Sequence, residues 1–217
     1  MKNLFKLLLS AMTLLLITLS TVHARSFEVT ITNLTPGQIF SPIFAVTHNH
    51  DQSLFTSGEA ATPELAALAQ DANADGLTDL LSSTAGVHEI VHGTGVILPG
   101  KSETLVINSH GRAKYLSLVS MLVSTNDAFL AVNRVKLPHR FSMMTVPAYD
   151  AGAEANDESC KYIPGPPCGN ANSASDEVGE GFVHIHSGIH GIGDLSAAKH
   201  DWRNPVAKIS IRRMRNY

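Results

Sequence analysis

Tyr115-Leu-Ser-Leu-Val-Ser-Met-Leu122 is the stretch that decides the fold class, because its apolar character is typical of a central strand in a sheet. Two more strand-like runs follow it along the chain, Phe129–Leu137 and Phe141–Val146. The same character marks the segments 27–33, 39–47, 102–107, 182–186 and 206–211, and the chain becomes strand-like again from Val87. Roughly eight short strands separated by Gly- and Pro-containing turns predict an all-β fold, an antiparallel β-sandwich.

One segment departs from the strand pattern. Thr62 is a candidate N-cap, Pro63 suits the first helical position, and Glu64 suits the positive end of a helix. We therefore expect a short helical insertion from Thr62 to Ser83, covering one end of a sheet.

The N-terminus has the pattern of a secretory leader. Lys2 and Lys6 precede an apolar run over residues 7–19, and Val22-His-Ala24 is a small-x-small cleavage signal. We expect a signal peptide over residues 1–24 and a single domain over residues 25–217. No later apolar stretch is long enough to span a membrane, so we expect no membrane span after leader cleavage.

Charge and cysteine content agree with export. The leader holds two of the 16 Lys and Arg residues and none of the 19 Asp and Glu residues, so the mature chain carries a net charge of −5. A mildly acidic chain does not favour a nucleic-acid partner. Cys160 and Cys168 flank a turn-forming segment within a long Gly-, Pro-, Asn- and Ser-rich stretch, 148–179. In an oxidising compartment, secreted or periplasmic, they are expected to form a disulfide.

Three carboxylates are candidate metal ligands. Asp127 ends the run Ser124-Thr-Asn-Asp127, and Asp150 and Glu154 lie in Tyr149-Asp-Ala-Gly-Ala-Glu154. If the two apolar runs between these clusters pair as neighbouring strands, the three side chains can meet at one end of a sheet. Hard oxygen donors of this kind suit Ca²⁺. Ordinary turn chemistry accounts for the same residues equally well, and spacing alone leaves both interpretations open.

Histidines suggest a different metal site. His184, His186 and His190 lie close in sequence, and strand alternation puts His184 and His186 on one face, where zinc or copper could bind. His48 and His50 form a second such pair. A histidine-ligated zinc or copper metalloenzyme of the cell envelope is therefore the alternative function. The competing interpretation is that these histidines only pin glycine-rich turns through hydrogen bonds.

Other catalytic or metal-binding motifs are weak. Asp71-Ala-Asn-Ala-Asp-Gly76 matches the first half of an EF-hand loop, but Ser82 stands where a bidentate Glu belongs. A polar turn between helices, with Gly76 as a C-cap, is the better interpretation. The sequence contains no Gly-x-Ser-x-Gly nucleophile motif, and we expect no enzymatic activity.

A family resemblance brings these residues together. Ser117-Leu-Val-Ser-Met-Leu-Val-Ser-Thr-Asn-Asp127-Ala-Phe-Leu130, followed by Asp150-Ala-Gly-Ala-Glu154, resembles the spondin N-terminal domain. The stretches 179–191 and 201–211 look like closing motifs of its bacterial members. The resemblance implies a C2-like β-sandwich that binds Ca²⁺ through positions matching Asp127, Asp150 and Glu154, the last of which is commonly Asp in the family. It also implies an exported, non-catalytic binding or adhesion protein, whose partner is an envelope or extracellular protein or glycan.

Overall fold

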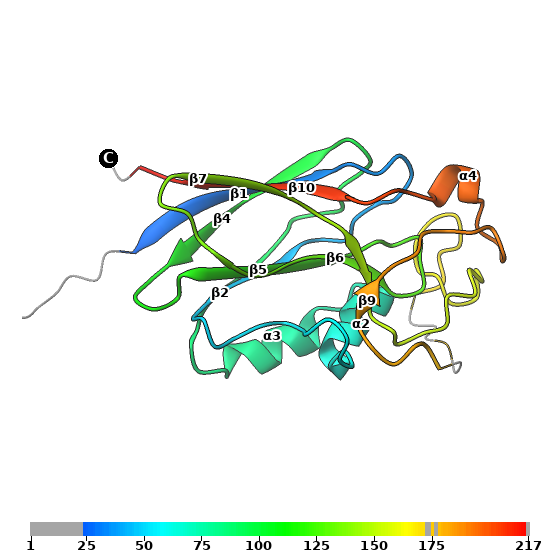
Figure 1. The fold of residues 1–217 in the computed structure, drawn as a ribbon, viewed down its shortest axis with the longest axis horizontal. Coiled ribbons are helices and arrows are strands. Elements are labelled where there is room, and N and C mark those ends of the chain that lie inside the picture. Colours follow the sequence, from blue (N-terminus) through cyan, green and yellow to red (C-terminus); the bar gives the residue numbers. More distant parts are fainter. Residues whose placement is uncertain (1–23, 172–174, 176–177, 216–217) are drawn as a thin grey trace, which may run out of the picture.

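Two antiparallel sheets packed face to face form the body of the molecule (Figure 1). The computed structural model describes residues 24–171, 175 and 178–215, so the predicted signal peptide lies outside the described residues apart from Ala24. The four-stranded sheet has the order β4 (Ser102–Ser109), β1 (Arg25–Asn33), β10 (Ala207–Arg213) and β7 (Phe141–Val146). The six-stranded sheet has the order β3 (Val87–His92), β2 (Phe44–His48), β5 (Tyr115–Met121), β6 (Ala128–Lys136), β8 (Ala148–Asp150) and β9 (His184–Ile185). The predicted antiparallel β-sandwich is confirmed.

The six-stranded sheet is apolar on both faces, which explains the strong signal of the 115–122 run. Leu118 on β5 and Leu130 on β6 point into the core between the two sheets, where they meet residues such as Ile31 and Ile209. Alternate residues of the same sheet point outward into a second core, which contains Phe44, Val46, Val119, Phe129 and Ala131. Such a strand reads as a continuous apolar run because both of its faces are covered.

Helices α2 (Pro63–Asp71) and α3 (Asp75–Ser82) provide that second cover. They lie under β2, β5 and β6 (Figure 1), so the insertion covers the outer face of the sheet. The sequence had suggested that it covers one end of a sheet. Thr62 is the N-cap of α2, and its Oγ1 accepts a hydrogen bond from Leu65 N at 3.3 Å. Gly76 lies inside α3, and Ala72, in the left-handed conformation, is the C-cap of α2. The expectation of Gly76 as a C-cap was wrong, because α3 starts only three residues after Ala72.

The long stretch 148–179 begins with a short strand that sequence reasoning missed. Strand β8 pairs with β6, with Ala128 opposite Asp150, and β9 then pairs with β8, with His184 opposite Asp150. The loops that follow β8 and β9, together with α4 (Ala197–His200), lie at the end of the sandwich opposite the C-terminus (Figure 1). None of the described helices is long and apolar enough to cross a lipid bilayer.

Candidate metal centre

The three predicted carboxylates meet at this end of the six-stranded sheet. Asp127 immediately precedes β6, Asp150 is the last residue of β8, and Glu154 follows four residues later. Because Ala128 and Asp150 face each other across the β6–β8 pair, the end of β8 lies beside the start of β6. All three carboxylate residues have 0% of their surface exposed, which is rare for charged groups that lack a compensating partner.

Two of these carboxylates are only half satisfied. Asp127 Oδ2 accepts hydrogen bonds from Ala153 N at 2.7 Å and from Glu154 N at 3.1 Å. Glu154 Oε1 accepts from Gln70 Nε2 at 3.0 Å and from Ser175 N at 2.8 Å. The second oxygen of each group, Asp127 Oδ1 and Glu154 Oε2, is buried without a hydrogen-bond partner among the described residues. Leaving such an acceptor unsatisfied costs about 1–3 kcal/mol each.

Burial and mutual repulsion disfavour the charged forms of these groups. Burial is the main cause that raises the pKa of Asp127 to about 8, and the charge of Asp150 is the second. Burial likewise raises the pKa of Glu154, against the effect of nearby donors that include Gln70 and the amide of Asn126. In the absence of a cation the cluster therefore holds a proton near neutral pH, and a divalent cation could take its place.

Asp150 lies at the centre and is more firmly held. Its Oδ1 accepts from Gly152 N at 2.7 Å, and its Oδ2 accepts from Asn156 Nδ2 at 2.7 Å. Gly152 has φ +65°, and a Cβ there would lie 2.5 Å from the carbonyl oxygen of Phe182. Only glycine suits this position, because it allows the 178–182 segment to pack directly against the turn after β8.

The histidine trio does not assemble as a site. His184 and His186 do share a side, with their Nε2 atoms 3.8 and 3.7 Å from the two oxygens of Asp150. His186 Nδ1, however, accepts from Gly188 N at 2.9 Å, so its proton is on Nε2, which lies 3.1 Å from Asn156 Oδ1. Both ring nitrogens are thus occupied, and burial lowers the pKa of His186 to about 4. Its role matches the turn-pinning interpretation.

The other histidines of the two predicted groups are also engaged elsewhere. His190 Nε2 lies 3.1 Å from Ser187 Oγ. His48 is buried, with Nδ1 on Asn49 O at 2.7 Å and Nε2 on Ser117 Oγ at 2.8 Å. His50 contacts the ring of Tyr115 from the surface. None of these three is placed to share a metal ion with His184.

A residue that sequence reasoning missed, Glu180, joins the centre instead. One ligand atom each from Asp150, Glu180 and His184 lie within 4.8 Å of one another, and they form the one such group of three among the described residues. Asp127 and Glu154 are not part of this group. The three predicted carboxylates therefore do not form a group of this kind among the described residues. No sequence pattern indicated Glu180, because Glu180 reaches the site only through the close packing of the 178–182 segment against Gly152.

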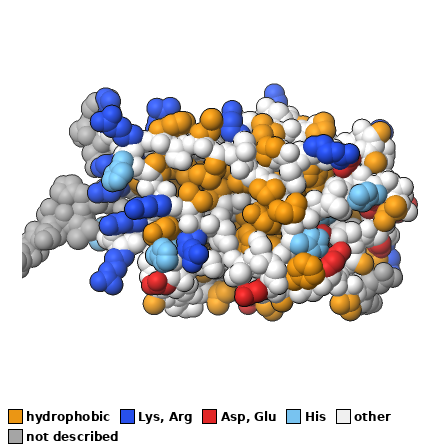
Figure 2. All heavy atoms as spheres, viewed as in Figure 1, with side chains coloured by type: hydrophobic (Ala, Val, Ile, Leu, Met, Phe, Trp, Pro, Cys, Tyr) orange, Lys and Arg blue, Asp and Glu red, His pale blue; other side chains and the backbone are white. Residues whose placement is uncertain are grey.

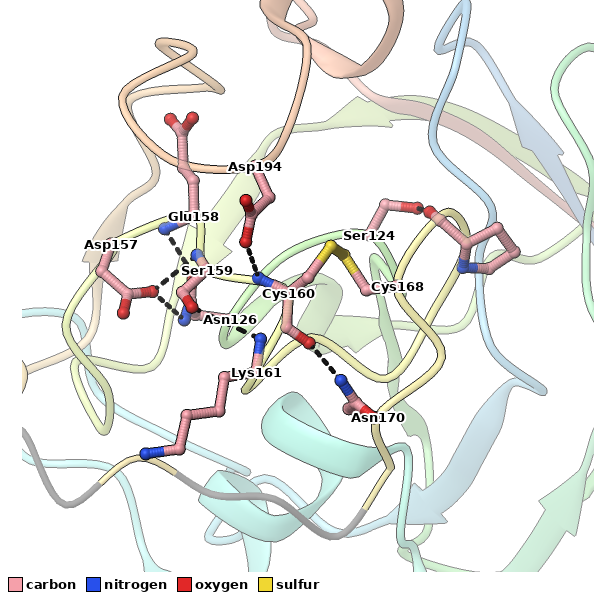
Figure 3. Close-up of a disulfide and its surroundings, with 11 residues drawn as sticks. Ser124, Asn126, Asp157, Glu158, Ser159, Cys160, Lys161, Cys168, Asn170 and Asp194 are labelled. Atoms are coloured by element: carbon pink, nitrogen blue, oxygen red, sulfur yellow. Dashed lines mark hydrogen bonds between the residues drawn. A yellow bond between two sulfur atoms is a disulfide. The ribbon is translucent and has the colours of Figure 1, made fainter.

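The predicted disulfide is present and braces the neighbouring loop. Cys160 and Cys168 are bonded, and Cys160 N donates to Asp194 Oδ2 at 2.8 Å (Figure 3). The nearby Glu158 points toward the 187–195 loop (Figure 3). Its carboxylate accepts from the backbone N–H groups of residues 190, 191 and 192, at 2.5, 2.7 and 3.0 Å. The loops around the carboxylates are thereby tied to one another.

Comparison with known proteins bears on the family. A family model described as Spondin_N, the spondin N-terminal domain, matches residues 15–159, more than half of the chain. The match includes Asp127, Asp150 and Glu154 and stops before the two closing motifs of the sequence. A search of curated proteins found no match. Domains of this kind are extracellular and generally non-catalytic, and a disulfide fits such a location. The chain therefore belongs to the spondin N-terminal domain family.

Proposed function

We propose that this protein is an exported, calcium-binding domain with a binding or adhesion role, in which Asp127, Asp150 and Glu154 hold the ion. The observation that carries the proposal is the pair of buried, unpartnered oxygens, Asp127 Oδ1 and Glu154 Oε2, in a cluster of three carboxylates. A divalent cation would satisfy both oxygens and offset the two causes that raise the pKa of Asp127, its burial and the charge of Asp150.

The ligand chemistry suits calcium better than softer metals. All three side chains offer carboxylate oxygens, and Ca²⁺ takes six to eight oxygens from carboxylates, carbonyls and water. We expect an affinity on the order of 10⁻⁴ to 10⁻³ M, as in other extracellular modules. Bound calcium would fix the turn after β8 against the start of β6, because Asp127 and Asp150 belong to these two elements.

The position of the site supports a role in binding. The ion would stiffen the loops at one end of the sandwich, where the disulfide and Glu158 already hold neighbouring segments (Figure 3). On the face seen in Figure 2, the Lys and Arg side chains gather mainly at the opposite end of the molecule. A partner that docks at the calcium end, an envelope or extracellular protein or glycan, would therefore meet few positive charges on this face.

Calorimetry tests the calcium site directly. Calcium is titrated into the mature protein, into Asp150→Ala and into Asp79→Ala, whose aspartate is exposed on α3. We expect binding heat from the wild type and from Asp79→Ala, and none from Asp150→Ala. Equal heats from all three proteins would contradict the proposal. Pull-down from an envelope fraction, with calcium and with chelator, then tests whether a partner requires the ion.

A further inference from the structure

His184 has the hydrogen bonding of a metal-ligating histidine. Its Nδ1 lies 3.1 Å from the backbone carbonyl oxygen of Ile185, and because a carbonyl can only accept, Nδ1 carries the proton. In the neutral ring the other nitrogen, Nε2, then presents its lone pair. This atom is buried and has no hydrogen-bond partner among the described residues. A ring whose distal N–H is held by a backbone carbonyl, with the opposite nitrogen free, is the usual arrangement of a histidine bound to a metal.

Two carboxylates face that nitrogen. His184 Nε2 lies 3.8 Å from Asp150 Oδ1 and 3.6 Å from Glu180 Oε2. An unprotonated nitrogen cannot donate a hydrogen bond to the two carboxylates that face it. A cation bound between the three atoms would satisfy all of them. Ligand atoms in a tetrahedral zinc site, at about 2.0–2.2 Å from the metal, lie about 3.4 Å apart. The observed separations exceed this spacing only slightly.

The three ligands are held by different means. The side chain of Asp150 is 1% exposed and accepts from Gly152 N and Asn156 Nδ2, which fixes its orientation. Asn156 Nδ2 also lies 3.3 Å from Glu180 Oε1, so one amide links the two carboxylates. The side chain of Glu180 is 39% exposed, which leaves a route from solvent to the site.

We propose that Asp150, Glu180 and His184 form a second metal site, selective for a borderline divalent ion such as Zn²⁺. One nitrogen and two carboxylate oxygens suit zinc and related transition ions, whereas Ca²⁺ takes oxygen ligands only. Three protein ligands leave a fourth position for water or for a donor from a partner. Glu180 and His184 lie beyond the matched family range of residues 15–159.

The proposed site shares Asp150 with the proposed calcium site, and the two can be tested separately. The full mature chain, prepared without a polyhistidine tag and stripped with chelator, is titrated with ZnCl₂ by calorimetry and with CoCl₂ by visible absorption. We expect one equivalent of zinc and a cobalt spectrum of low coordination number. His184→Ala and Glu180→Gln should each weaken zinc binding by more than about ten-fold.

Two further variants distinguish the proposed zinc site from binding by a nearby histidine and from the proposed calcium site. His190→Ala removes a nearby exposed histidine whose Nε2 contacts Ser187 Oγ, and it should bind zinc like the wild type. Glu154→Gln should lose calcium and keep zinc, so failure of one site leaves the other measurable. Because Glu180 is partly exposed, Glu180→Gln should fold even if His184→Ala does not. Absence of zinc binding, or zinc affinity unchanged in Glu180→Gln and His184→Ala, would overturn the second site.

Discussion

Two kinds of buried carboxylate lie at the same end of the sandwich, and they differ in how many of their oxygens accept hydrogen bonds. Glu158 is 2% exposed, and both of its oxygens accept backbone N–H groups of the 187–195 loop. Asp127 and Glu154 are equally buried, but each keeps one oxygen without a partner among the described residues. Burial alone therefore does not mark a metal site. The calcium proposal rests instead on the unsatisfied oxygens, for which the described residues supply no hydrogen-bond donor.

We call Glu158 the anchor, because its hydrogen bonds are complete, and we call Asp127 and Glu154 the receptor, because each keeps an oxygen for an ion. Glu158 stabilises the metal-free fold, so its removal should lower the free energy of unfolding with or without calcium. Asp127 and Glu154 carry a cost in the metal-free protein, and they should stabilise only when an ion is present. The following experiments compare the two kinds of carboxylate in these terms.

The largest expected effect comes from the anchor. Glu158→Ala leaves the N–H groups of residues 190–192 without their acceptor, and should lower the free energy of unfolding by about 3 kcal/mol. Denaturant unfolding should give the same loss in calcium and in chelator. Glu59→Ala, at an exposed glutamate, is the control and should change little. A loss seen only with calcium present would make Glu158 part of the receptor.

Asp127→Asn should have the opposite dependence. At a calcium concentration of 100 times Kd the wild type should gain about 2.7 kcal/mol, and the variant should gain almost nothing. In chelator above pH 8, where Asp127 of the wild type is charged, the variant should be at least as stable as the wild type, because an amide removes the repulsion from Asp150. Thermal melting with and without calcium measures both effects. Destabilisation in chelator would show that the Asp127 charge is already satisfied.

The pH dependence follows from the same contrast. The folded-state pKa of Asp127, about 8, lies above its ordinary value of 3.8, so the folded state binds more protons than the unfolded state between these values. In chelator, stability should therefore fall as pH rises through this window, by at most about 2 kcal/mol between pH 6.5 and 8. Calcium or Asp127→Asn should remove the slope.

His186 contributes a slope of the opposite sign, at lower pH. Its folded-state pKa of about 4 lies below the ordinary 6.5, so its stabilising effect is present above pH 6.5 and is lost as pH falls toward 4. Measurements above pH 6.5 therefore isolate Asp127 from this histidine. A flat profile there for the wild type in chelator would argue against a protonated cluster.

The smallest effect tests how the helices connect to the centre. Gln70, on α2, donates to Glu154 Oε1 at 3.0 Å. Gln70→Ala should cost about 1 kcal/mol, because Ser175 N still serves the same oxygen. Gln52→Ala removes an exposed hydrogen bond that Gln52 Nε2 donates to Ala85 O, and it is the matched control. A larger loss than for Glu158→Ala would reverse the ranking of the two carboxylates.

The strand pattern and the family motifs of the sequence predict much of this structure. The 115–122 run lies in the middle of the larger sheet because both of its faces are apolar, and Thr62 caps α2 because its local chemistry suffices. Both features depend on neighbours in sequence or on strand periodicity, which a single chain displays directly. The two runs between Asp127 and Asp150 do not pair with each other as the sequence suggested, because β6 belongs to the six-stranded sheet and β7 to the four-stranded sheet; the short strand β8 brings Asp150 beside the start of β6 instead.

Only the tertiary structure decided the remainder. Strand β8 is three residues long and carries no periodicity, and it exists because β6 offers it an edge. Glu180 reaches Asp150 because Gly152 lets a distant segment approach its backbone closely. The separate roles of His184 and His186 depend on which nitrogen finds a backbone partner. The sequence by itself determined the β-sandwich and the acidic residues at its end, whereas hydrogen bonding across the fold decided which of them remain unsatisfied.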